Sequence, residues 1–287
     1  MINWLRKKTF LLKNKKTIYL IDSDEDKDFV IFHLEKEKIL GLDTEFDWRT
    51  TYYPVLSLLQ ISSTDKIFLI DCIKCKKLDY LKELLEDKNK LVIFHSSRSD
   101  TTVLHTNLNI KIENIYDIQI AEKNISNGDI LNYAAIVKKY FYTNLKKTET
   151  NSNWLKRPFS KEQLSYAADD VNYLIEIYTE QIKVLKKILK LNKAFKESKK
   201  ESILGNQDLH LSRINKLKKP SKMEKTIFMW REDYAKELNI PTSYIFKNKD
   251  LKKLSLLCEV KELDHRKILN IFEKSLFAED FINFFKN

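Results

Sequence analysis

Short runs of apolar residues alternate with amphipathic stretches over the first part of the chain. Short apolar runs between polar residues are typical of β-strands, and apolar residues three and four positions apart are typical of helices. The runs predict strands at residues 17–21, 39–45, 55–62, 66–71 and 91–94. Helical stretches are predicted near residues 25–34, 78–86 and 98–104. This alternation predicts an α/β domain with a mixed sheet.

From Ser160 onward the pattern is helical. Ser160 and Gln163 have the spacing of a capping box, which predicts that a helix begins at Ser160. Further on, apolar residues at helical spacing among lysines predict one long helix that runs into a linker, with Pro220 as a breaker. We therefore expect an α/β domain at residues 1–195, a basic helix and linker at 196–224 and a small all-α domain at 225–287.

Glycine is scarce in this chain of 287 residues, which has only Gly41, Gly128 and Gly205. The glycine-rich turns that bind dinucleotides or nucleoside triphosphates need several glycines close together, so no nucleotide cofactor is expected. The apolar runs are far shorter than the roughly 20 residues of a membrane-spanning helix, and lysines interrupt the N-terminal stretch. We expect a cytoplasmic protein that does not bind membranes.

Cys72 and Cys75 form an isolated Cys-x-x-Cys pair. A structural zinc site would need a second pair of ligands, and the sequence around these cysteines offers none at the usual spacing. Two reduced thiols in a cytosolic protein are the simpler interpretation, and a metal or redox role is the alternative.

The net charge is +11, with 52 Lys and Arg against 41 Asp and Glu. Residues 178–225 contain fourteen Lys and Arg but only five Asp and Glu, so this segment holds most of the excess. A basic stripe of this kind can bind the phosphates of a nucleic acid. It is equally typical of a solvated helix face, and the pattern alone leaves both interpretations open.

Two carboxylates lie close together in the predicted strand 39–45. Asp43 and Glu45 are two residues apart, so their side chains project from the same face. Like charges at this separation raise each other's pKa unless a cation lies between them. An edge strand with acidic side chains in water is the alternative, but the residues before Asp43 are too apolar for an edge. A central strand with its carboxylates at one end of the sheet is favoured.

Other candidate groups follow later in the chain. Tyr166 and Asp170 are four residues apart in the helix that begins at Ser160, so they lie on the same face of that helix. Asp100 falls in the first turn of the helical stretch that follows strand 91–94. Taken singly, Tyr166 and Asp170 could be an ordinary surface pair, and Asp100 could simply interact with the helix dipole.

Taken together, these segments resemble the ribonuclease D family. The resemblance rests on D-T-E-F at 43–46, F-H-x-x-x-x-D at 94–100 and W-L-x-R-P through Y-x-x-x-D at 154–170. The W-R-E motif and the residues after it, at 230–251, resemble the helicase-and-RNase-D C-terminal (HRDC) domain. The resemblance extends over nearly the whole chain. It implies an RNase H-like mixed sheet flanked by helices, followed by one HRDC-like helical domain.

The resemblance also implies a chemistry, that of a 3′→5′ exonuclease of the DEDD superfamily, in the branch with a tyrosine in its third motif. Two divalent ions, Mg²⁺ or Mn²⁺, would activate water and stabilise the leaving oxygen. Asp43 would bridge both ions, Glu45 and Asp170 would complete the site that activates water, and Asp100 would serve the second ion through water. Tyr166 would orient the attacking water, because a phenol pKa of about 10 is poorly suited to a general base.

The expected partner is RNA. By resemblance, the protein would be a monomer that trims the 3′ ends of structured RNA, above all tRNA precursors, and releases nucleoside 5′-monophosphates. Trp48, Tyr52 and Tyr53 could stack on terminal bases, or Tyr52 and Tyr53 could belong to a core. A 3′→5′ exonuclease acting on DNA and a non-catalytic RNA-binding protein on the same scaffold are the alternatives.

Several neighbouring residues offer competing assignments. His95 and Asp100 have the spacing of the superfamily's histidine branch, but that branch places its histidine in the last motif. Asp169 points about 100° away from Asp170 around the helix. Asp47 lies where the chain should leave the strand, and Asp117 is expected to cap a helix. Ile-Leu-Asn replaces the family's Leu-Gly-Leu at the start of the helix predicted at 130–140, which leaves the substrate range open.

Overall fold

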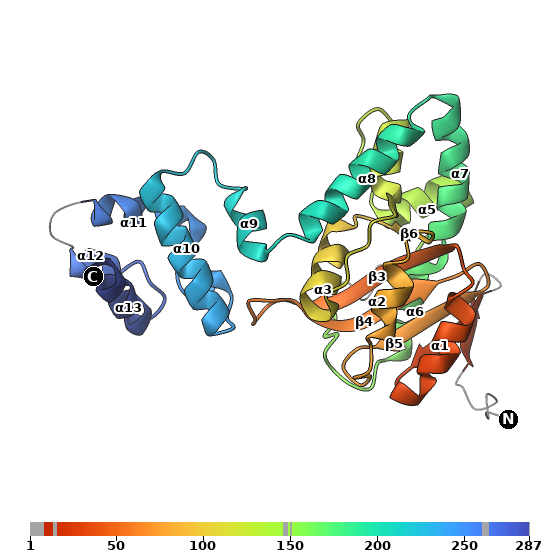
Figure 1. Cartoon of the computed structure of the whole chain (residues 1–287), viewed down its shortest axis with the longest axis horizontal. Coiled ribbons are helices and arrows are strands. Elements are labelled where there is room, and N and C mark those ends of the chain that lie inside the picture. The colour runs from red at the N-terminus through yellow and green to blue at the C-terminus, as the bar shows by residue number, and fades with distance from the viewer. Residues whose placement is uncertain (1–8, 14–15, 146–148, 150, 260–263, 287) are drawn as a thin grey trace. The chain divides into compact units, whose positions relative to one another are not determined.

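The chain forms two compact units in the computed structural model (Figure 1), which describes residues 9–13, 16–145, 149, 151–259 and 264–286. The first unit comprises Met1–Asp47 and Val55–Asn206, and the second comprises Trp48–Pro54 and Gln207–Asn287. In the described part of the chain, no helix is both long enough and apolar enough to cross a membrane.

A seven-stranded mixed sheet forms the centre of the first unit, with the order β1-β2-β5-β4-β3-β6-β7. The strands are β1 Thr9–Lys13, β2 Lys16–Ile21, β3 Ile39–Asp47, β4 Val55–Ser62, β5 Lys66–Asp71, β6 Leu91–Phe94 and β7 Ile115–Asp117. All five predicted strands are present, whereas β1 and β7 were not predicted. β3 pairs antiparallel with β4 and parallel with β6, which confirms that it is a central strand.

Helices cover both faces of this sheet, and apolar side chains fill the space on each side. Figure 1 shows α1 and α2 on one face and α6 on the other. The helices of this unit are α1 Lys27–Leu34, α2 Tyr80–Leu85, α3 Arg98–Leu108, α4 Ile118–Ile125, α5 Tyr133–Phe141, α6 Lys161–Asn172, α7 Leu174–Lys187 and α8 Leu191–Gly205. The predicted α/β architecture with a mixed sheet is confirmed.

The prediction of one long basic helix is wrong, because the chain turns between α7 and α8. Leu189 has a positive φ of 57° in this turn. After it, α8 packs against the edge of the sheet, where Ser198 Oγ accepts a hydrogen bond from the backbone of Asp117 and Ser202 Oγ donates one to Ile112. The predicted linker at 196–224 therefore needs correction, since its first ten residues belong to α8 and to the first unit.

Gly205 shows why α8 must end in a glycine. A Cβ atom built on Gly205 would lie 2.0 Å from Thr101 Oγ1 and 2.7 Å from the carbonyl oxygen of Arg98. Both of these atoms belong to α3, so the two helices approach each other more closely than any other residue would allow. The scarce glycines thus include one that serves helix packing rather than phosphate binding.

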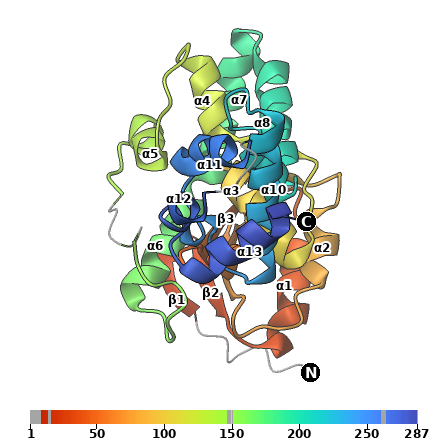
Figure 2. The same ribbon diagram turned by 90° about the vertical axis from the view of Figure 1, so that its left-hand side faces the viewer.

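The second unit contains only helices and 3₁₀ turns where the structure describes it (Figure 1 and Figure 2). Its α-helices are α9 Leu209–Ile214, α10 Lys222–Glu237, α11 Leu251–Cys258, α12 His265–Leu269 and α13 Ser275–Lys286. The helix α10 begins with a capping box formed by Ser221 and Glu224. Apolar residues of these helices form a separate core.

A loop from the α/β part of the sequence contributes to this second core. Trp48–Pro54 connects β3 to β4, and Tyr52 in this loop is only 2% exposed. Its hydroxyl donates a hydrogen bond to Glu232 Oε2 at 2.9 Å, and the Arg213 guanidinium lies 4.7 Å from the ring centre. Tyr52 is therefore a core residue, and the interpretation that it stacks on bases is wrong. Trp48 and Tyr53 are partly buried against the same core.

Candidate active site

The candidate site lies on the face of β3 that α6 covers. Asp43 and Glu45 are half-buried on β3, and Asp170 is half-buried in the last turn of α6. The capping box predicted at the start of this helix is confirmed, since Ser160 Oγ accepts from the backbone of Gln163 and Gln163 Oε1 accepts from the backbone of Ser160. The start of α6 is thus fixed by local sequence.

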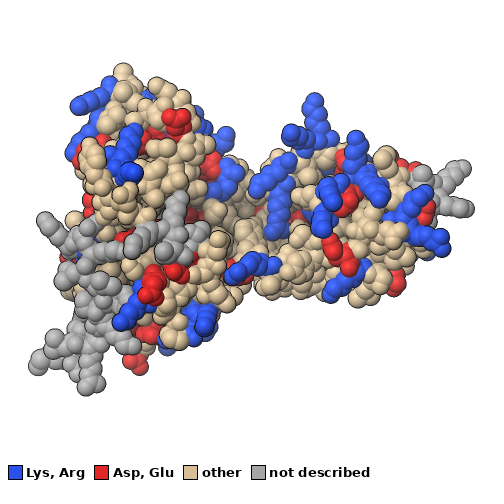
Figure 3. Space-filling view, turned by 180° about the vertical axis from the view of Figure 1, so that it is seen from behind, with Lys and Arg blue, Asp and Glu red and all other residues tan. Residues whose placement is uncertain are grey.

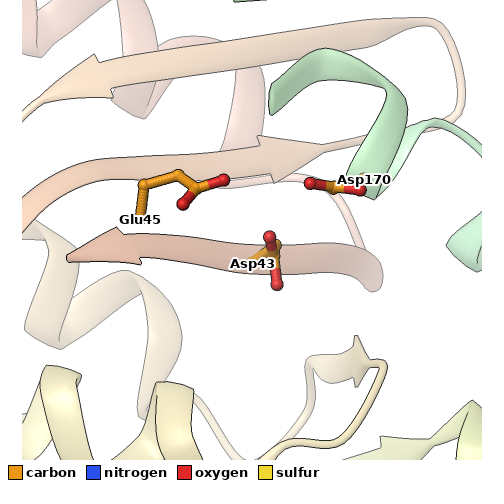
Figure 4. Close-up of side chains that lie close together, drawn as sticks. All are labelled: Asp43, Glu45 and Asp170. Atoms are coloured by element: carbon orange, nitrogen blue, oxygen red, sulfur yellow. The ribbon is translucent and has the colours of Figure 1, made fainter. Parts of the chain in front are cut away.

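Three carboxylates converge at this point. Asp43, Glu45 and Asp170 each offer one oxygen, and these oxygens lie within 4.8 Å of one another. Figure 4 shows the side chains approaching from β3 and from α6. Hard oxygen donors in a tight group are the ligands that Mg²⁺ and Mn²⁺ prefer. The residues present therefore fit a divalent cation.

Asp100 approaches β3 in a different way. The strand β6 is paired with β3 only as far as Gly41, and the chain then turns into α3, which carries Asp100. The carboxylate of Asp100 accepts hydrogen bonds from the backbone N–H of Thr44 at 3.1 Å and from Thr44 Oγ1 at 2.6 Å. Asp100 is thus held against the strand between Asp43 and Glu45, although it is not one of the three that converge. Sequence reasoning did not identify Thr44 as its partner.

Without a metal ion, the raised pKa values of Asp43 and Glu45 favour their protonated forms. Burial, followed by the charges of Asp100 and Asp170, raises the pKa of Asp43 well above its ordinary value. Burial and the same neighbouring charges raise the pKa of Glu45 to about 9. Burial raises the pKa of Asp100 to about 7, although the hydrogen bonds from Thr44 act in the opposite direction. A divalent cation would relieve this repulsion and displace the protons.

Metal binding is therefore expected to become tighter as the pH rises from 6 to 9. At neutral pH, Glu45 must lose a proton before its carboxylate can bind a cation, and each displaced proton makes the affinity rise about tenfold per pH unit. Calorimetric titration with Mn²⁺ in buffers of different ionisation enthalpy measures the protons released. Glu45→Gln should release fewer protons than the wild type. An affinity that does not change with pH would contradict this prediction.

Tyr166 lies on α6 one turn before Asp170, as predicted. Its ring is half-buried and packs near Trp154, with ring centres 6.2 Å apart. This arrangement presents a phenol and one of the three converging carboxylates on the same helix face. The role of Tyr166 in orienting water stays a prediction.

The residues that offered competing assignments for the site lie in other environments in the structure. Asp117 caps α4 as predicted, because its carboxylate accepts hydrogen bonds from the backbone of Gln119 and Ile120. Contrary to prediction, β3 continues to Asp47, but a register shift between Glu45 and Phe46 interrupts the alternation that Asp47 would otherwise continue. The Nε2 atom of His95 lies 3.3 Å from the carbonyl oxygen of Leu131.

The two cysteines of the Cys-x-x-Cys pair are free in the structure. Burial raises the pKa of the Cys75 thiol to about 12 and shifts the pKa of Cys72 in the same direction. Metal binding and redox exchange both require the thiolate. These pKa shifts favour the interpretation of Cys72 and Cys75 as unreactive thiols.

The mixed sheet, with its carboxylate cluster between β3 and α6, defines an exonuclease-type domain. Residues 18–186 match the family of 3′–5′ exonucleases. The chain therefore belongs to the 3′–5′ exonuclease family, which depends on metal ions. The predicted RNase H-like exonuclease fold and the resemblance to ribonuclease D are confirmed by this match and by the relatives below.

The similar proteins include bacterial ribonucleases D. Ribonuclease D of Desulfotalea psychrophila is 32% identical over 244 residues, which cover 80% of this chain and 64% of that protein. The crystal structure of Escherichia coli RNase D, an exoribonuclease involved in structured RNA processing, has a TM-score of 0.76 at 22% identity, over 91% of this chain and 74% of that chain. Brucella melitensis NrnC with bound Mg²⁺ has a TM-score of 0.57 at 22% identity, over 71% of this chain and 97% of that chain. The chain spans less than two thirds of the length of the curated ribonucleases D that it matches.

Proposed function

We propose that this protein is a divalent-metal-dependent 3′→5′ exoribonuclease. It trims the 3′ ends of structured RNA, with tRNA precursors as its main substrates, and releases nucleoside 5′-monophosphates. The convergence of Asp43, Glu45 and Asp170 within 4.8 Å carries the proposal. The sequence similarity to bacterial ribonucleases D supports RNA as the substrate class.

Four carboxylates and one phenol have separate proposed roles in the reaction. Asp43 would bind both of two divalent cations, Glu45 and Asp170 would complete the position that activates water, and Asp100 would serve the second position through water. Bound cations supply Lewis-acid stabilisation of the charge that develops on the phosphate and on the leaving 3′-oxygen. The hydroxyl of Tyr166 orients the attacking water. The hydrogen bonds from Thr44 to Asp100 support a separate role for Asp100, because they hold its carboxylate against β3 while Asp43, Glu45 and Asp170 converge.

The basic residues supply the affinity for the body of the RNA. Residues 207–287 contain 17 Lys and Arg against 12 Asp and Glu. Figure 3 shows blue Lys and Arg side chains at many points on the surface of the second unit, at the right of the view. Phosphate contacts of this kind bind without reading sequence and weaken as salt increases. We infer that the second unit, with the HRDC-like character predicted for it, contributes to RNA binding. The monomeric state and the cytoplasmic location stay predictions.

Matched RNA and DNA substrates test the proposal. A 5′-labelled tRNA with a 3′ extension should shorten one nucleotide at a time in Mg²⁺, and a 3′-phosphate or a chelator should stop the reaction. A DNA strand of the same sequence should be degraded much more slowly. Preferential degradation of DNA would favour the alternative 3′→5′ exonuclease, and binding of RNA without any cleavage in Mg²⁺ or Mn²⁺ would favour the non-catalytic alternative.

A further inference from the structure

The last turn of α6 carries Asp170, and side chains from other elements are hydrogen-bonded to its backbone. The final carbonyl groups of a helix have no partner within that helix and must be satisfied in another way. The carbonyl of Asn172 accepts from Lys16 Nζ at 2.9 Å, and the carbonyl of Val171 accepts from Ser62 Oγ at 2.8 Å. Lys16 lies on β2 and Ser62 on β4, so the sheet itself holds this turn.

Tyr133 makes the third and most specific contact with this turn. Its hydroxyl donates to the carbonyl of Asp169 at 3.0 Å and accepts from the backbone N–H of Tyr173 at 3.2 Å. In an uninterrupted helix, the N–H of Tyr173 would bond directly to the carbonyl of Asp169, four residues earlier. The hydroxyl of Tyr133 is therefore inserted into the hydrogen-bond ladder between these two residues. Insertions of this kind bend or break helices.

The insertion coincides with the end of α6 and the start of α7. Tyr173 is the residue between the two helices, with φ −108° and ψ 0°. Beyond the break, Leu174 lies over Gly41 of β3, where an added Cβ would be 3.0 Å from Leu174 Cβ and 2.4 Å from Ser62 Oγ. The junction thus packs directly on the strand that carries Asp43. A small shift of the junction would move Asp170 relative to Asp43.

Tyr133 is well suited to hold this position. It is the first residue of α5, which begins after the N-cap Asn132, and its side chain is 9% exposed. Burial, together with the nearby charges of Asp170 and Asp43, raises the pKa of Tyr133 well above its ordinary value. The hydroxyl therefore keeps its proton and remains a donor to Asp169.

We propose that Tyr133 is a positioning residue for the metal-binding carboxylates. Its hydroxyl breaks the helix between α6 and α7 and holds the last turn of α6 so that Asp170 faces Asp43 and Glu45. Lys16 and Ser62 support the same turn from the sheet. The inference rests on the proposed function only in that the three carboxylates bind a divalent cation. Tyr133 acts through Asp170 and is not itself a ligand.

Tyr133→Phe tests this role, because it removes the hydroxyl and keeps the ring. Residues that orient metal ligands typically change metal affinity by about 10–100-fold when they are altered. Calorimetric titration of the metal-free protein with Mn²⁺ should show about tenfold weaker binding than in the wild type. Tyr116→Phe is the matched control, since it removes a buried hydroxyl that bonds to Gln181 on another part of the unit. The control should bind Mn²⁺ as the wild type does.

Kinetics separate positioning from a general loss of stability. At limiting Mg²⁺, Tyr133→Phe should lower kcat for RNA trimming and leave KM for RNA unchanged, and excess Mg²⁺ should restore most of the rate. Ser62→Ala removes a different donor to the same turn and should also weaken Mn²⁺ binding, which provides a second test if Tyr133→Phe folds poorly. The calorimetric measurement does not depend on cleavage, so it stands even if the protein fails to degrade RNA. Wild-type Mn²⁺ affinity in both variants would overturn the proposal.

Discussion

Asp43→Asn is expected to abolish RNA trimming and, at the same time, to make the metal-free protein more stable. Asp43 lies at the centre of the acidic group, since it shares the converging set with Glu45 and Asp170 and its pKa responds to the charge of Asp100. An amide cannot replace the carboxylate in the proposed role of binding two cations. Loss of several kcal/mol of Lewis-acid stabilisation corresponds to a fall in kcat/KM of at least about 10³-fold.

The gain in stability has the same electrostatic origin. An amide of nearly the same shape removes one of the mutually repelling acidic groups that the fold holds together. The effect depends on pH, because the folded protein holds protons at Glu45 with a pKa of about 9, above the roughly 4.3 of an unfolded chain. The protons held by the folded state stabilise the metal-free protein fully below about pH 4. This contribution to the free energy of unfolding is lost as the pH rises from about 4 through 9. The pKa of Asp43 is itself raised well above its ordinary value, so Asp43 contributes to the same loss and Asp43→Asn should reduce it.

Thermal unfolding and trimming assays check both parts of this prediction. The Tm of metal-free Asp43→Asn should exceed that of the wild type at pH 8, and Mg²⁺ should raise the Tm of the wild type but not of the variant. Asp169→Asn is the matched control, because it alters the neighbouring carboxylate on α6, and it should retain trimming. Near-normal trimming by Asp43→Asn, or a lower Tm without metal, would contradict the account of the site.

Arg157→Met is expected to destabilise the first unit by about 3–5 kcal/mol. The Arg157 guanidinium donates to both carboxylate oxygens of Asp71, at 2.6 and 2.8 Å, and also to the carbonyl of Trp154. The side chain of Asp71 is only 2% exposed. Methionine would fill much of the space of Arg157 but leave the buried carboxylate without its cation. This interaction fixes the segment that leads into Ser160 and α6.

Chemical denaturation of the wild type and the variant gives this loss of free energy. Arg98→Met is the control, because Arg98 pairs with Glu201 where both side chains are partly exposed. Such pairs contribute about 1 kcal/mol or less, so the control should lose far less stability than Arg157→Met. Replacing Asp71 by Asn together with Arg157→Met should recover part of the loss. If Arg157→Met and Arg98→Met lost similar amounts of stability, the buried pair of Arg157 and Asp71 would contribute no more than the exposed pair of Arg98 and Glu201, and the prediction would be wrong.

Local sequence was sufficient for five of the seven described strands, for the starts of α4 and α6, and for pointing to the candidate residues. The strands that carry and flank Asp43 followed from short apolar runs, because a buried strand needs such residues over its whole length. The starts of α4 and α6 followed from Asp117 and Ser160, because an N-cap interacts with backbone groups only two or three residues away. The family resemblance then connected Asp43, Glu45, Asp100 and Asp170, which are far apart in the chain.

Only the tertiary structure decided how these residues are held. The hydroxyl of Tyr133 interrupts the helix at Tyr173, forty residues later. Thr44 binds Asp100 across 56 positions, and Tyr52, in the loop Trp48–Pro54, completes the core of a unit whose helices all lie after Gln207. The break between α7 and α8 likewise serves packing against a distant sheet edge. Hydrophobic periodicity and capping motifs report contacts within a few residues, whereas these hydrogen bonds and close approaches depend on which elements meet after the chain has folded.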